Sequence, residues 1–226
     1  IKSAKDIKKN QHLLPGILKS NTLGYDGKGQ FVLNSLDDIK KDWCFTNDYI
    51  LEKKVDLKKE ISVVIARYSD GTMTSYEPIE NIHQNQILYK SKIPAGISDK
   101  IFKNAINNAK KIAENFSYVG ILTIEYFITK KDELLVNELA PRFHNSGHLT
   151  IEAFNISQFE NHIRAVCNLK SKPIEKISNA EMYNILGFEI QNYKKKTFKK
   201  NEFFHDYLKK EPREGRKMGH LTILTD

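Results

Sequence analysis

Two apolar stretches joined by a polar turn constrain the fold of this chain more than any other feature. The first stretch is residues 121–128. A polar turn at 129–133 separates it from the second, which is the apolar run that leads into residues 136–148. With a two-residue loop at 131–132, such a segment forms a β-hairpin in which Glu125 lies directly opposite Glu138. The sequence therefore predicts a hairpin with two opposed carboxylates; a frayed hairpin with a longer loop, which would separate them, remains the alternative.

Like charges directly opposed on a sheet are destabilising, so we expect a cation between these two carboxylates. Mg²⁺ is commonly held by one or two carboxylates together with the phosphates of a substrate. The stretch 136–148 adds an arginine, two histidines, an asparagine and a serine. A stable core does not need this mixture, whereas a site for phosphates, metals or small polar substrates does.

The composition is that of an ordinary globular protein, with 226 residues, 40% hydrophobic and 28% charged. No apolar run is long enough to span a bilayer, and no secretory leader is recognisable. Cys44 and Cys167 are far apart and lack metal-ligand spacing. We therefore expect a cytoplasmic protein without a disulfide framework, and the first residue, Ile1, suggests a part of a longer polypeptide.

The formal net charge of +8 raises the question of nucleic-acid binding. The lysines are scattered through the chain, with denser groups only at 194–196, 199–200 and 209–210. This distribution favours a solvated lysine-rich surface over a nucleic-acid interface, and a basic protein can equally bind phosphorylated small molecules.

The N-terminal part, residues 1–51, reads as a small α/β unit. It contains short strands near Leu18, Val32 and Ile50, and a helix from Leu36 to Trp43 that Ser35 would cap. Residues 60–93 alternate in β fashion, with a hairpin turn at Ser69-Asp70-Gly71.

The clearest helix in the sequence is 98–115, which has an apolar stripe at helical spacing. The pattern predicts a second helix over 150–169, irregular near 155–157. Its core-facing residues would be Phe154, Phe159, Ile163 and Val166. Beyond Pro173, short β segments flank a lysine-rich stretch, which indicates a small C-terminal domain.

Two further segments could bind phosphate. The loop 21–30 has three glycines in six positions, which lets backbone N–H groups approach phosphate oxygens, and Lys28 adds charge there. A mobile hairpin turn is the alternative for this loop. The segment 209–220 gathers cations around a Pro/Gly turn; a solvated loop is its default, and a phosphate clamp requires folding against Arg142.

Taken together, these segments resemble the ATP-grasp superfamily, and within it the N5-carboxyaminoimidazole ribonucleotide synthetase family. Residues 23–30 resemble that family's lid loop, 137–153 its active-site signature, and 215–220 its C-terminal signature. Many ATP-grasp enzymes have an asparagine two residues after the second metal-binding glutamate. Ala140 stands there instead, as in this particular family.

The resemblance implies an α/β (α+β) ATP-grasp fold with a small, mostly β C-terminal domain. It divides the chain into a lid subdomain at 1–51, a core subdomain at 52–172 and the C-terminal domain at 173–226. The family also has an N-terminal domain before the lid, which we do not find in this chain. That domain helps to form the ribonucleotide site, so this part alone is expected to bind ATP but can lack turnover.

The implied reaction is the carboxylation of 5-aminoimidazole ribonucleotide to its N5-carboxy derivative, a step of de novo purine (IMP) biosynthesis. ATP phosphorylates bicarbonate to carboxyphosphate, which the exocyclic amine then attacks, either directly or after release of CO₂. The implied cofactors are ATP and Mg²⁺, for which Mn²⁺ can substitute. The implied state is a cytoplasmic homodimer that binds small-molecule substrates, and neither nucleic acid nor membrane.

The resemblance also assigns roles to individual residues. Those for ATP are Lys19, Tyr25, Asp26, Gly27, Lys28, Gly29, Gln30, Glu52, Lys53, Lys54, Val55, Glu60, His83, Asn137 and Glu138. Those for the metal are Glu125 and Glu138. Those for bicarbonate chemistry are Arg142, His144 and Asn145, and those for the ribonucleotide 5′-phosphate are Lys210, Arg213 and Arg216.

Two other functions remain as alternatives. One is a different ATP-grasp ligase, using formate or glycine, or a biotin carboxylase; Ala140 and the run His144-Asn145-Ser146 count against it. The other is a nucleotide-binding regulatory module without catalysis. Its weakness is that a non-catalytic binder has no need of two opposed carboxylates.

Overall fold

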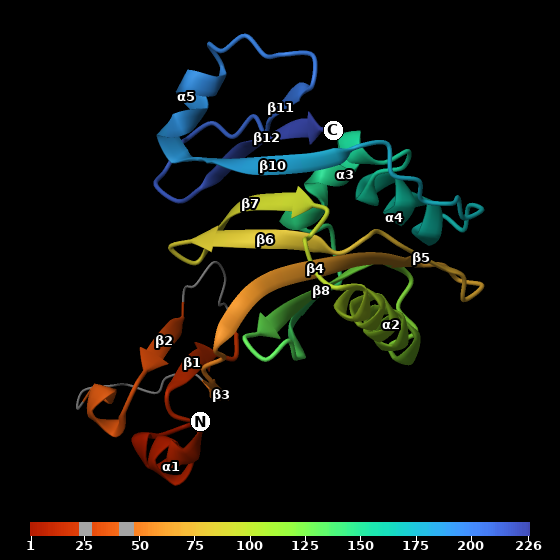
Figure 1. The fold of residues 1–226 in the computed structure, drawn as a ribbon. Coiled ribbons are helices and arrows are strands. Elements are labelled where there is room, and N and C mark those ends of the chain that lie inside the picture. Colours follow the sequence, from red (N-terminus) through yellow and green to blue (C-terminus); the bar gives the residue numbers. More distant parts are fainter. Residues whose placement is uncertain (23–28, 41–47) are drawn as a thin grey trace. The chain divides into compact units, whose positions relative to one another are not determined.

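The protein consists of two compact units, Ile1–Asp56 and Leu57–Asp226. The structure is a computed structural model that describes residues 1–22, 29–40 and 48–226 (Figure 1). The predicted loop residues Tyr25 to Lys28 lie outside the described residues.

The first unit is built around a three-stranded antiparallel sheet with the order β2-β1-β3. Its elements are α1 (Ala4–Lys9), η1 (Gln11–Leu13), β1 (Gly16–Ser20), β2 (Gln30–Leu33), η2 (Leu36–Asp38) and β3 (Tyr49–Lys53). The three predicted strands are therefore confirmed. The buried core is small and consists of Ile7, Leu18, Leu33 and Leu51.

The predicted helix from Leu36 is wrong in length. Ser35 does cap it, accepting a hydrogen bond from the Asp37 backbone N–H, but the 3₁₀ helix η2 ends at Asp38 and Ile39 is extended. A single turn is enough to place both Leu36 and Ile39 against the core of the unit. Residues 41–47 of the predicted helix lie outside the described part of the chain.

The second unit is built around a nine-stranded sheet in which all neighbouring strands are antiparallel. The order is β11-β12-β10-β7-β6-β4-β8-β9, with β5 paired to β4. The strands are β4 (Leu57–Arg67), β5 (Met73–Ser75), β6 (Ile79–Gln84), β7 (Ile87–Ile93), β8 (Gly120–Thr129), β9 (Leu134–Ala140), β10 (Asn179–Leu186), β11 (Glu202–Asp206) and β12 (Lys217–Thr225). The helices are α2 (Asp99–Asn115), η3 (Asn145–Leu149), α3 (Thr150–Ala153), α4 (Gln158–Val166), η4 (Gly187–Glu189) and α5 (Ile190–Tyr193).

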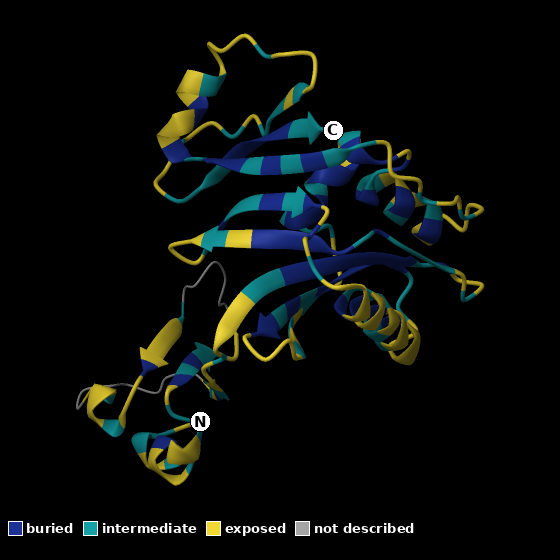
Figure 2. Cartoon of the chain, in the orientation of Figure 1, coloured by how far each residue is buried: buried dark blue, intermediate teal, exposed yellow. Residues whose placement is uncertain are grey.

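Helices cover both faces of the middle of this sheet (Figures 1 and 2). On β4, Ile61, Val63 and Ile65 pack with α2, whereas Val64 and Ala66 pack with η3, α3 and α4 on the opposite face. Successive side chains of a strand point to opposite faces, so a strand buried on both faces is apolar at nearly every position. The C-terminal strands extend the same sheet, because β10 pairs with β7.

The helix predicted at 98–115 is confirmed as α2. Ser98 is its N-cap and accepts a hydrogen bond from the Ile101 backbone N–H. The buried stripe consists of Ile101, Ala105, Ala109 and Ala113. The small alanine side chains let the helix approach the sheet closely.

The second predicted helix is broken where irregularity was expected, into α3 and α4, and Ser157 caps α4. The prediction that Ile163 and Val166 face the core is wrong, since these side chains are 51% and 47% exposed. The buried face of α4 carries Gln158, Asn161 and Ala165 instead. Asn161 is held there by the Tyr68 hydroxyl, which donates a hydrogen bond of 2.6 Å to its side-chain oxygen.

The β8–β9 hairpin reaches the predicted register by a different route. Its loop is longer than two residues: the Thr129 N–H donates to the Glu133 carbonyl, and Asp132 takes up the left-handed conformation with φ 60°. A β-bulge next to Glu125 then shifts the pairing by one residue. The two differences cancel, so Glu125 does lie opposite Glu138.

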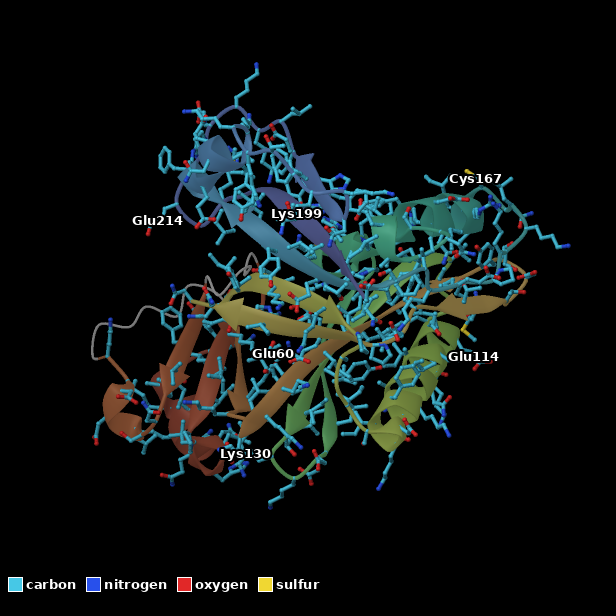
Figure 3. The ribbon with its side chains drawn as sticks, turned by 45° about the horizontal axis from the view of Figure 1, so that its top comes forward. Glu60, Glu114, Lys130, Cys167, Lys199 and Glu214 are labelled. Atoms are coloured by element: carbon cyan, nitrogen blue, oxygen red, sulfur yellow. The ribbon has the colours of Figure 1, made fainter. Side chains whose placement is uncertain are left out.

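Charged residues lie mostly at the periphery of the second unit. Figure 3 shows Lys130 at the hairpin end, Glu214 in the C-terminal loop and the exposed thiol of Cys167 after α4. Among the described residues, none of the helices has the length and apolar character needed to cross a membrane.

Candidate active site

The opposed carboxylates occupy the sheet face that η3 covers. Glu125 is largely buried, with 17% of its side chain exposed, and Glu138 is exposed. Within the described part of the chain, the Glu138 carboxylate makes no hydrogen bond or ion pair. Two like charges directly opposed on a sheet destabilise it, and among the described residues the Glu138 carboxylate has no cationic partner to offset the repulsion. The oxygen atoms of both carboxylates are suitable ligands for a hard cation such as Mg²⁺. The residues present therefore fit the metal that the ATP-grasp resemblance implies.

His144 is the partner of Glu125. Its Nε2 lies 2.7 Å from Glu125 Oε1. Burial raises the pKa of the Glu125 carboxyl, but the hydrogen bond from His144 and the charges of His144, His83 and Lys217 outweigh it and hold that pKa below its usual value. The carboxylate is therefore ionised at neutral pH and available to a cation.

A chain of buried side chains continues from the other nitrogen of His144. Its Nδ1 lies 2.8 Å from Ser146 Oγ, which lies 2.7 Å from Ser62 Oγ. Asn81 donates to Ser62 Oγ at 3.0 Å and accepts from Ser91 Oγ at 2.9 Å. Ser146, Ser62, Asn81 and Ser91 are each at most 6% exposed, and we refer to these four as the buried polar chain.

The buried polar chain fixes the protonation pattern of His144. The Ser146 backbone N–H also points to His144 Nδ1, at 3.4 Å, so this nitrogen is an acceptor. The ring proton then sits on Nε2 and is donated to Glu125. The same pattern lets Asn81 donate to Ser62, Ser62 to Ser146, and Ser146 to the ring, so that every member has a partner.

A second carboxylate–histidine pair lies on the neighbouring strands. His83 Nδ1 on β6 is 3.0 Å from Glu60 Oε2 on β4, which is an ion-pair distance. Burial lowers the pKa of His83, but Glu60 and the charge of Glu125 raise it, with a net increase. Glu60, His83, Glu125 and Lys217 therefore interact within one region of the sheet.

The segment that carries His144 is tied down at both ends. Asn145 exchanges side-chain hydrogen bonds with Asn184 on β10, at 3.0 and 2.5 Å. The Gln158 amide accepts from the His144 backbone N–H and donates to its carbonyl. A Cβ at Gly147 would come within 2.6 Å of this amide, which explains the glycine at that position. Arg142 lies just before the segment, is exposed, and donates to the Phe143 carbonyl.

The cations of the basic C-terminal segment, residues 209–220, differ from one another in exposure and in their partners. Lys209 is partly buried, and burial and the charges of Arg216 and Lys217 lower its pKa. Arg213 is bound to Glu211 at 2.6 Å, and Lys210 is exposed. Arg216 donates to the Glu211 carbonyl at 2.7 Å. Of the three cations predicted to bind phosphate, Arg216 is the one whose charge lowers the pKa of Lys209, after burial, which is the larger cause.

The predicted nucleotide residues of the first unit lie on β1 and β3. Lys19 Nζ is 2.6 Å from Glu52 Oε2 across these strands, and Gln30 on β2 pairs with Lys19. Lys53 ends β3, and the Lys54 N–H donates to the Pro15 carbonyl. Gly29 takes up positive φ before β2, and Val55 follows β3 with its side chain half-buried.

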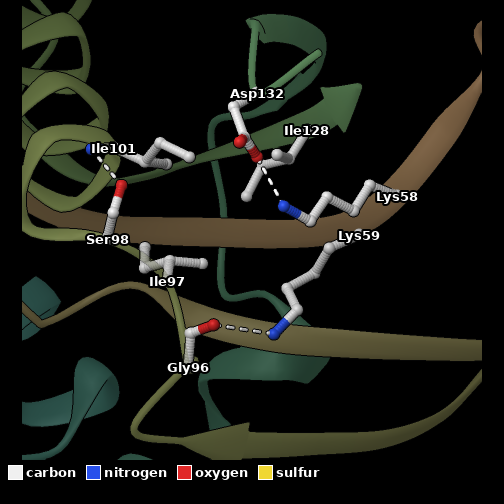
Figure 4. Close-up of a pocket in the computed structure, with 8 residues that line it drawn as sticks. All are labelled: Lys58, Lys59, Gly96, Ile97, Ser98, Ile101, Ile128 and Asp132. Atoms are coloured by element: carbon white, nitrogen blue, oxygen red, sulfur yellow. Dashed lines mark hydrogen bonds and ion pairs between the residues drawn. The ribbon is translucent and has the colours of Figure 1, made fainter. Parts of the chain in front are cut away.

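A small pocket of about 120 Å³ lies elsewhere, between α2 and the start of β4 (Figure 4). Lys58 pairs with Asp132 there, and Lys59 with Gly96. Ligand pockets usually have volumes of about 300 Å³ or more, and none of the lining residues belongs to the predicted site. This pocket therefore does not compete with the carboxylate region as the candidate site.

The comparisons with known proteins agree with the geometry. A family model described as the ATP-grasp domain matches residues 1–159. The chain belongs to the ATP-grasp family. A second model, the phosphoribosylaminoimidazole carboxylase C-terminal domain, matches residues 180–226.

Several of the similar proteins are named N5-carboxyaminoimidazole ribonucleotide synthase or synthetase. N5-carboxyaminoimidazole ribonucleotide synthase of Brucella melitensis is 43% identical over 92% of this chain and 58% of its own length. A structure of the Staphylococcus aureus synthetase with ADP matches all of this chain and 62% of its own, with a TM-score of 0.91 and 37% identity. The Aspergillus clavatus synthase with ADP and 5-aminoimidazole ribonucleotide matches 99% of this chain and 62% of its own, with a TM-score of 0.90 and 30% identity. The chain thus spans about 60% of the length of these relatives.

Several residues of this ATP-grasp site escaped the sequence analysis. Ser62, Asn81 and Ser91 lie within β strands as isolated polar residues, and Lys209 and Lys217 lie among many lysines. A small polar residue within a strand that is apolar on both faces, such as Ser62, is the signal that could have been used. For the lysines, the basic segment 209–220 was the available signal, but it did not distinguish Lys209 and Lys217 from the other cations there.

Proposed function

We propose that this chain forms the ATP-grasp part of an enzyme that carboxylates 5-aminoimidazole ribonucleotide to N5-carboxyaminoimidazole ribonucleotide, using ATP and bicarbonate in purine biosynthesis. The observation that carries the proposal is the pair of opposed carboxylates, Glu125 and Glu138, with His144 bound to Glu125 at 2.7 Å. The names of the relatives, and the two ligands of the Aspergillus clavatus structure, support the choice of substrates.

The nucleotide roles are assigned as follows. Lys19 and Lys28 neutralise the triphosphate, the backbone from Glu52 to Val55 lines the adenine pocket, and Glu60 accepts from the ribose hydroxyls. His83, paired with Glu60, lies near the nucleotide, and Gly29 and Gln30 belong to the lid. A closed lid excludes water, which would otherwise hydrolyse carboxyphosphate.

Glu125 and Glu138 would hold Mg²⁺, with Mn²⁺ as a substitute. The metal, when bound, would supply positive charge that offsets the negative charge of the ATP phosphates during phosphoryl transfer. Asn137, the extra residue of the β-bulge, adjoins Glu138. The bulge places the Glu138 carboxylate, rather than the Asn137 amide, opposite Glu125, as bulges near active sites often re-aim a side chain.

The bicarbonate chemistry belongs to Arg142, His144 and Asn145. A bicarbonate oxygen attacks the γ-phosphorus of ATP and ADP leaves; the ribonucleotide amine then attacks the carboxyl carbon of carboxyphosphate, and phosphate leaves. Arg142 would stabilise the anion, since its guanidinium has no carboxylate partner among the described residues. The buried polar chain holds the His144 ring in place during both steps.

The ribonucleotide 5′-phosphate is assigned to Lys210, Arg213 and Arg216, and we add Lys209. Burial and the charges of Arg216 and Lys217 lower the pKa of Lys209, and an anion bound beside Lys209 would offset this repulsion. Arg216→Ala should mainly raise the KM for the ribonucleotide. An unchanged KM would place the phosphate elsewhere.

The deciding experiment measures ADP release from Mg·ATP and bicarbonate, with and without 5-aminoimidazole ribonucleotide. It should be made on the gene product that contains this chain. We expect strong stimulation by the ribonucleotide, and none when formate or glycine replaces bicarbonate. Stimulation by formate or glycine would indicate another ligase, and tight ATP binding without stimulated hydrolysis would indicate a regulatory module.

The proposal extends to organisation. It comprises a lid subdomain at 1–51, a core subdomain at 52–172, a C-terminal domain at 173–226, and a cytoplasmic homodimer. Sedimentation equilibrium tests the homodimer, and a monomer at micromolar concentration would contradict it.

A further inference from the structure

A third carboxylate–histidine cluster lies outside the carboxylate region, where α3 packs against the C-terminal strands (Figure 1). His205 on β11 is directly opposite His220 on β12, and the two rings stack with centroids 4.4 Å apart. Glu152 on α3 reaches the same point, with Oε1 2.6 Å from His205 Nε2. One ligand atom from each of these three residues lies within 4.8 Å of the others.

Two buried atoms of this cluster have no hydrogen-bond partner. They are Glu152 Oε2 and His220 Nε2. The side chain of Glu152 is 7% exposed and His220 is 2% exposed, so water does not readily satisfy these atoms. Buried polar atoms almost always have a partner, and two that face one cluster indicate a missing ligand.

The surroundings prepare His220 to act as a ligand. Its Nδ1 lies 2.9 Å from the hydroxyl of Tyr207, and burial raises the pKa of that tyrosine, which keeps it a neutral phenol. A proton on Nδ1, donated to this hydroxyl, leaves the lone pair of Nε2 directed into the cluster. A metal-binding histidine is typically oriented in this way by a hydrogen bond from its other nitrogen.

We propose that Glu152, His205 and His220 bind one transition-metal ion, for which Zn²⁺ is the best fit. Two imidazole nitrogens and one carboxylate are ligands that Zn²⁺ accepts, with a fourth position left for water. The ion displaces the proton shared by His205 Nε2 and Glu152 Oε1. This site differs from the Glu125–Glu138 pair, whose oxygen-only donors suit Mg²⁺.

The test is a calorimetric titration of the 226-residue chain with Zn²⁺ in the presence of excess Mg²⁺, which occupies oxygen-only sites. We expect one Zn²⁺ per chain. Glu152→Gln and His205→Gln should each weaken binding by about 100-fold or more, because each removes a ligand. The matched controls are Glu160→Gln, an exposed carboxylate on α4, and His12→Gln, an exposed histidine of the first unit; both should bind as the parent does.

A second measurement distinguishes a lost ligand from a lost fold. Co²⁺ in the parent should show visible absorption of a nitrogen-ligated, four-coordinate ion, absent in Glu152→Gln although its metal-free circular dichroism is unchanged. If either ligand variant misfolds, Tyr207→Phe replaces it, with an expected weakening of about tenfold. Zn²⁺ binding that is unchanged in the folded ligand variants, or in Tyr207→Phe where it replaces them, overturns the proposal.

Discussion

The two faces of the central sheet differ in what they bury. The face under α2 buries mainly apolar side chains, such as Ile61, Val63 and Ile124. The buried carboxylate of Glu80, which lies opposite Ile61, is paired with Lys59. The face under η3 buries Ser62 and Asn81 as well, next to the largely buried Glu125. Burying polar groups is unfavourable unless each has a partner, and on this face the buried polar chain provides those partners. The face under α2 therefore contributes mainly to stability, whereas the face under η3 positions the side chains of the candidate site.

The strongest test of this division is Glu138→Gln. The change removes one of the two proposed metal ligands, so it should lower Mg²⁺-dependent turnover about 1000-fold. Because it also removes one of two opposed charges, the free energy of unfolding should stay equal or rise. The measurement is steady-state ADP release together with urea unfolding. Glu114→Gln, at the exposed end of α2, is the control and should change neither quantity. Near-normal rates in Glu138→Gln would mean that the metal assignment is wrong.

A pH titration of stability tests the polar face next. Burial, and then the charges of His144, His205 and Lys217, lower the pKa of His148 to about 4. The unfolded chain then binds more protons than the folded chain between pH 6.5 and 4, so stability falls as the pH falls through this window. The full loss from this one group is about 3 kcal/mol at pH 4.

Urea unfolding at several pH values measures this effect. In His148→Gln the slope of stability against pH should decrease, and the exposed control His12→Gln should keep the slope of the parent. His220, whose pKa burial lowers to about 2, and the carboxyls with lowered pKa values, such as Glu125, still contribute a slope of the same sign. An identical slope in parent and His148→Gln would show that His148 titrates normally.

The sequence predicted the apolar face better than the polar face, for a physical reason. Periodicity reports burial of apolar residues, and it located α2, which begins at Asp99, one residue after the predicted start. It failed for α4, where Ile163 faces outward because Asn161 takes the buried side to bind the Tyr68 hydroxyl. A hydrogen bond between residues so distant in sequence leaves no periodic signal.

The candidate site was predictable from the sequence only in part. The opposition of Glu125 and Glu138 followed from counting residues across a hairpin, although the loop and the bulge each differed from the expectation. The connection of His144 to Ser62 could not be foreseen, because 84 residues separate Ser62 from Ser146. Contacts of this kind depend on the packing of η3 onto the sheet.

Ser146→Ala breaks the buried polar chain at its link to His144. The turnover number should fall about tenfold, because the ring loses the partner that fixes its orientation, while the KM for ATP should stay the same. Ser62 also loses a partner, which should lower the free energy of unfolding by about 1–3 kcal/mol. Ser91→Ala, at the end of the buried polar chain farthest from His144, is the matched control for stability and should lower turnover much less than Ser146→Ala does. Equal turnover in Ser146→Ala and the parent would show that the buried polar chain contributes to stability but not to catalysis.

The smallest expected effect is that of Ile124→Val, and it separates the two faces most directly. Ile124 is fully buried under α2 and adjoins Glu125, which points to the opposite face. Removing one methylene should lower the free energy of unfolding by about 1 kcal/mol through lost packing. Turnover and both KM values, measured well below the unfolding temperature, should match the parent. A change in turnover larger than that of Ser146→Ala would show that packing under α2 also controls the site, because the backbone of β8 would then transmit a shift of Ile124 to its neighbour.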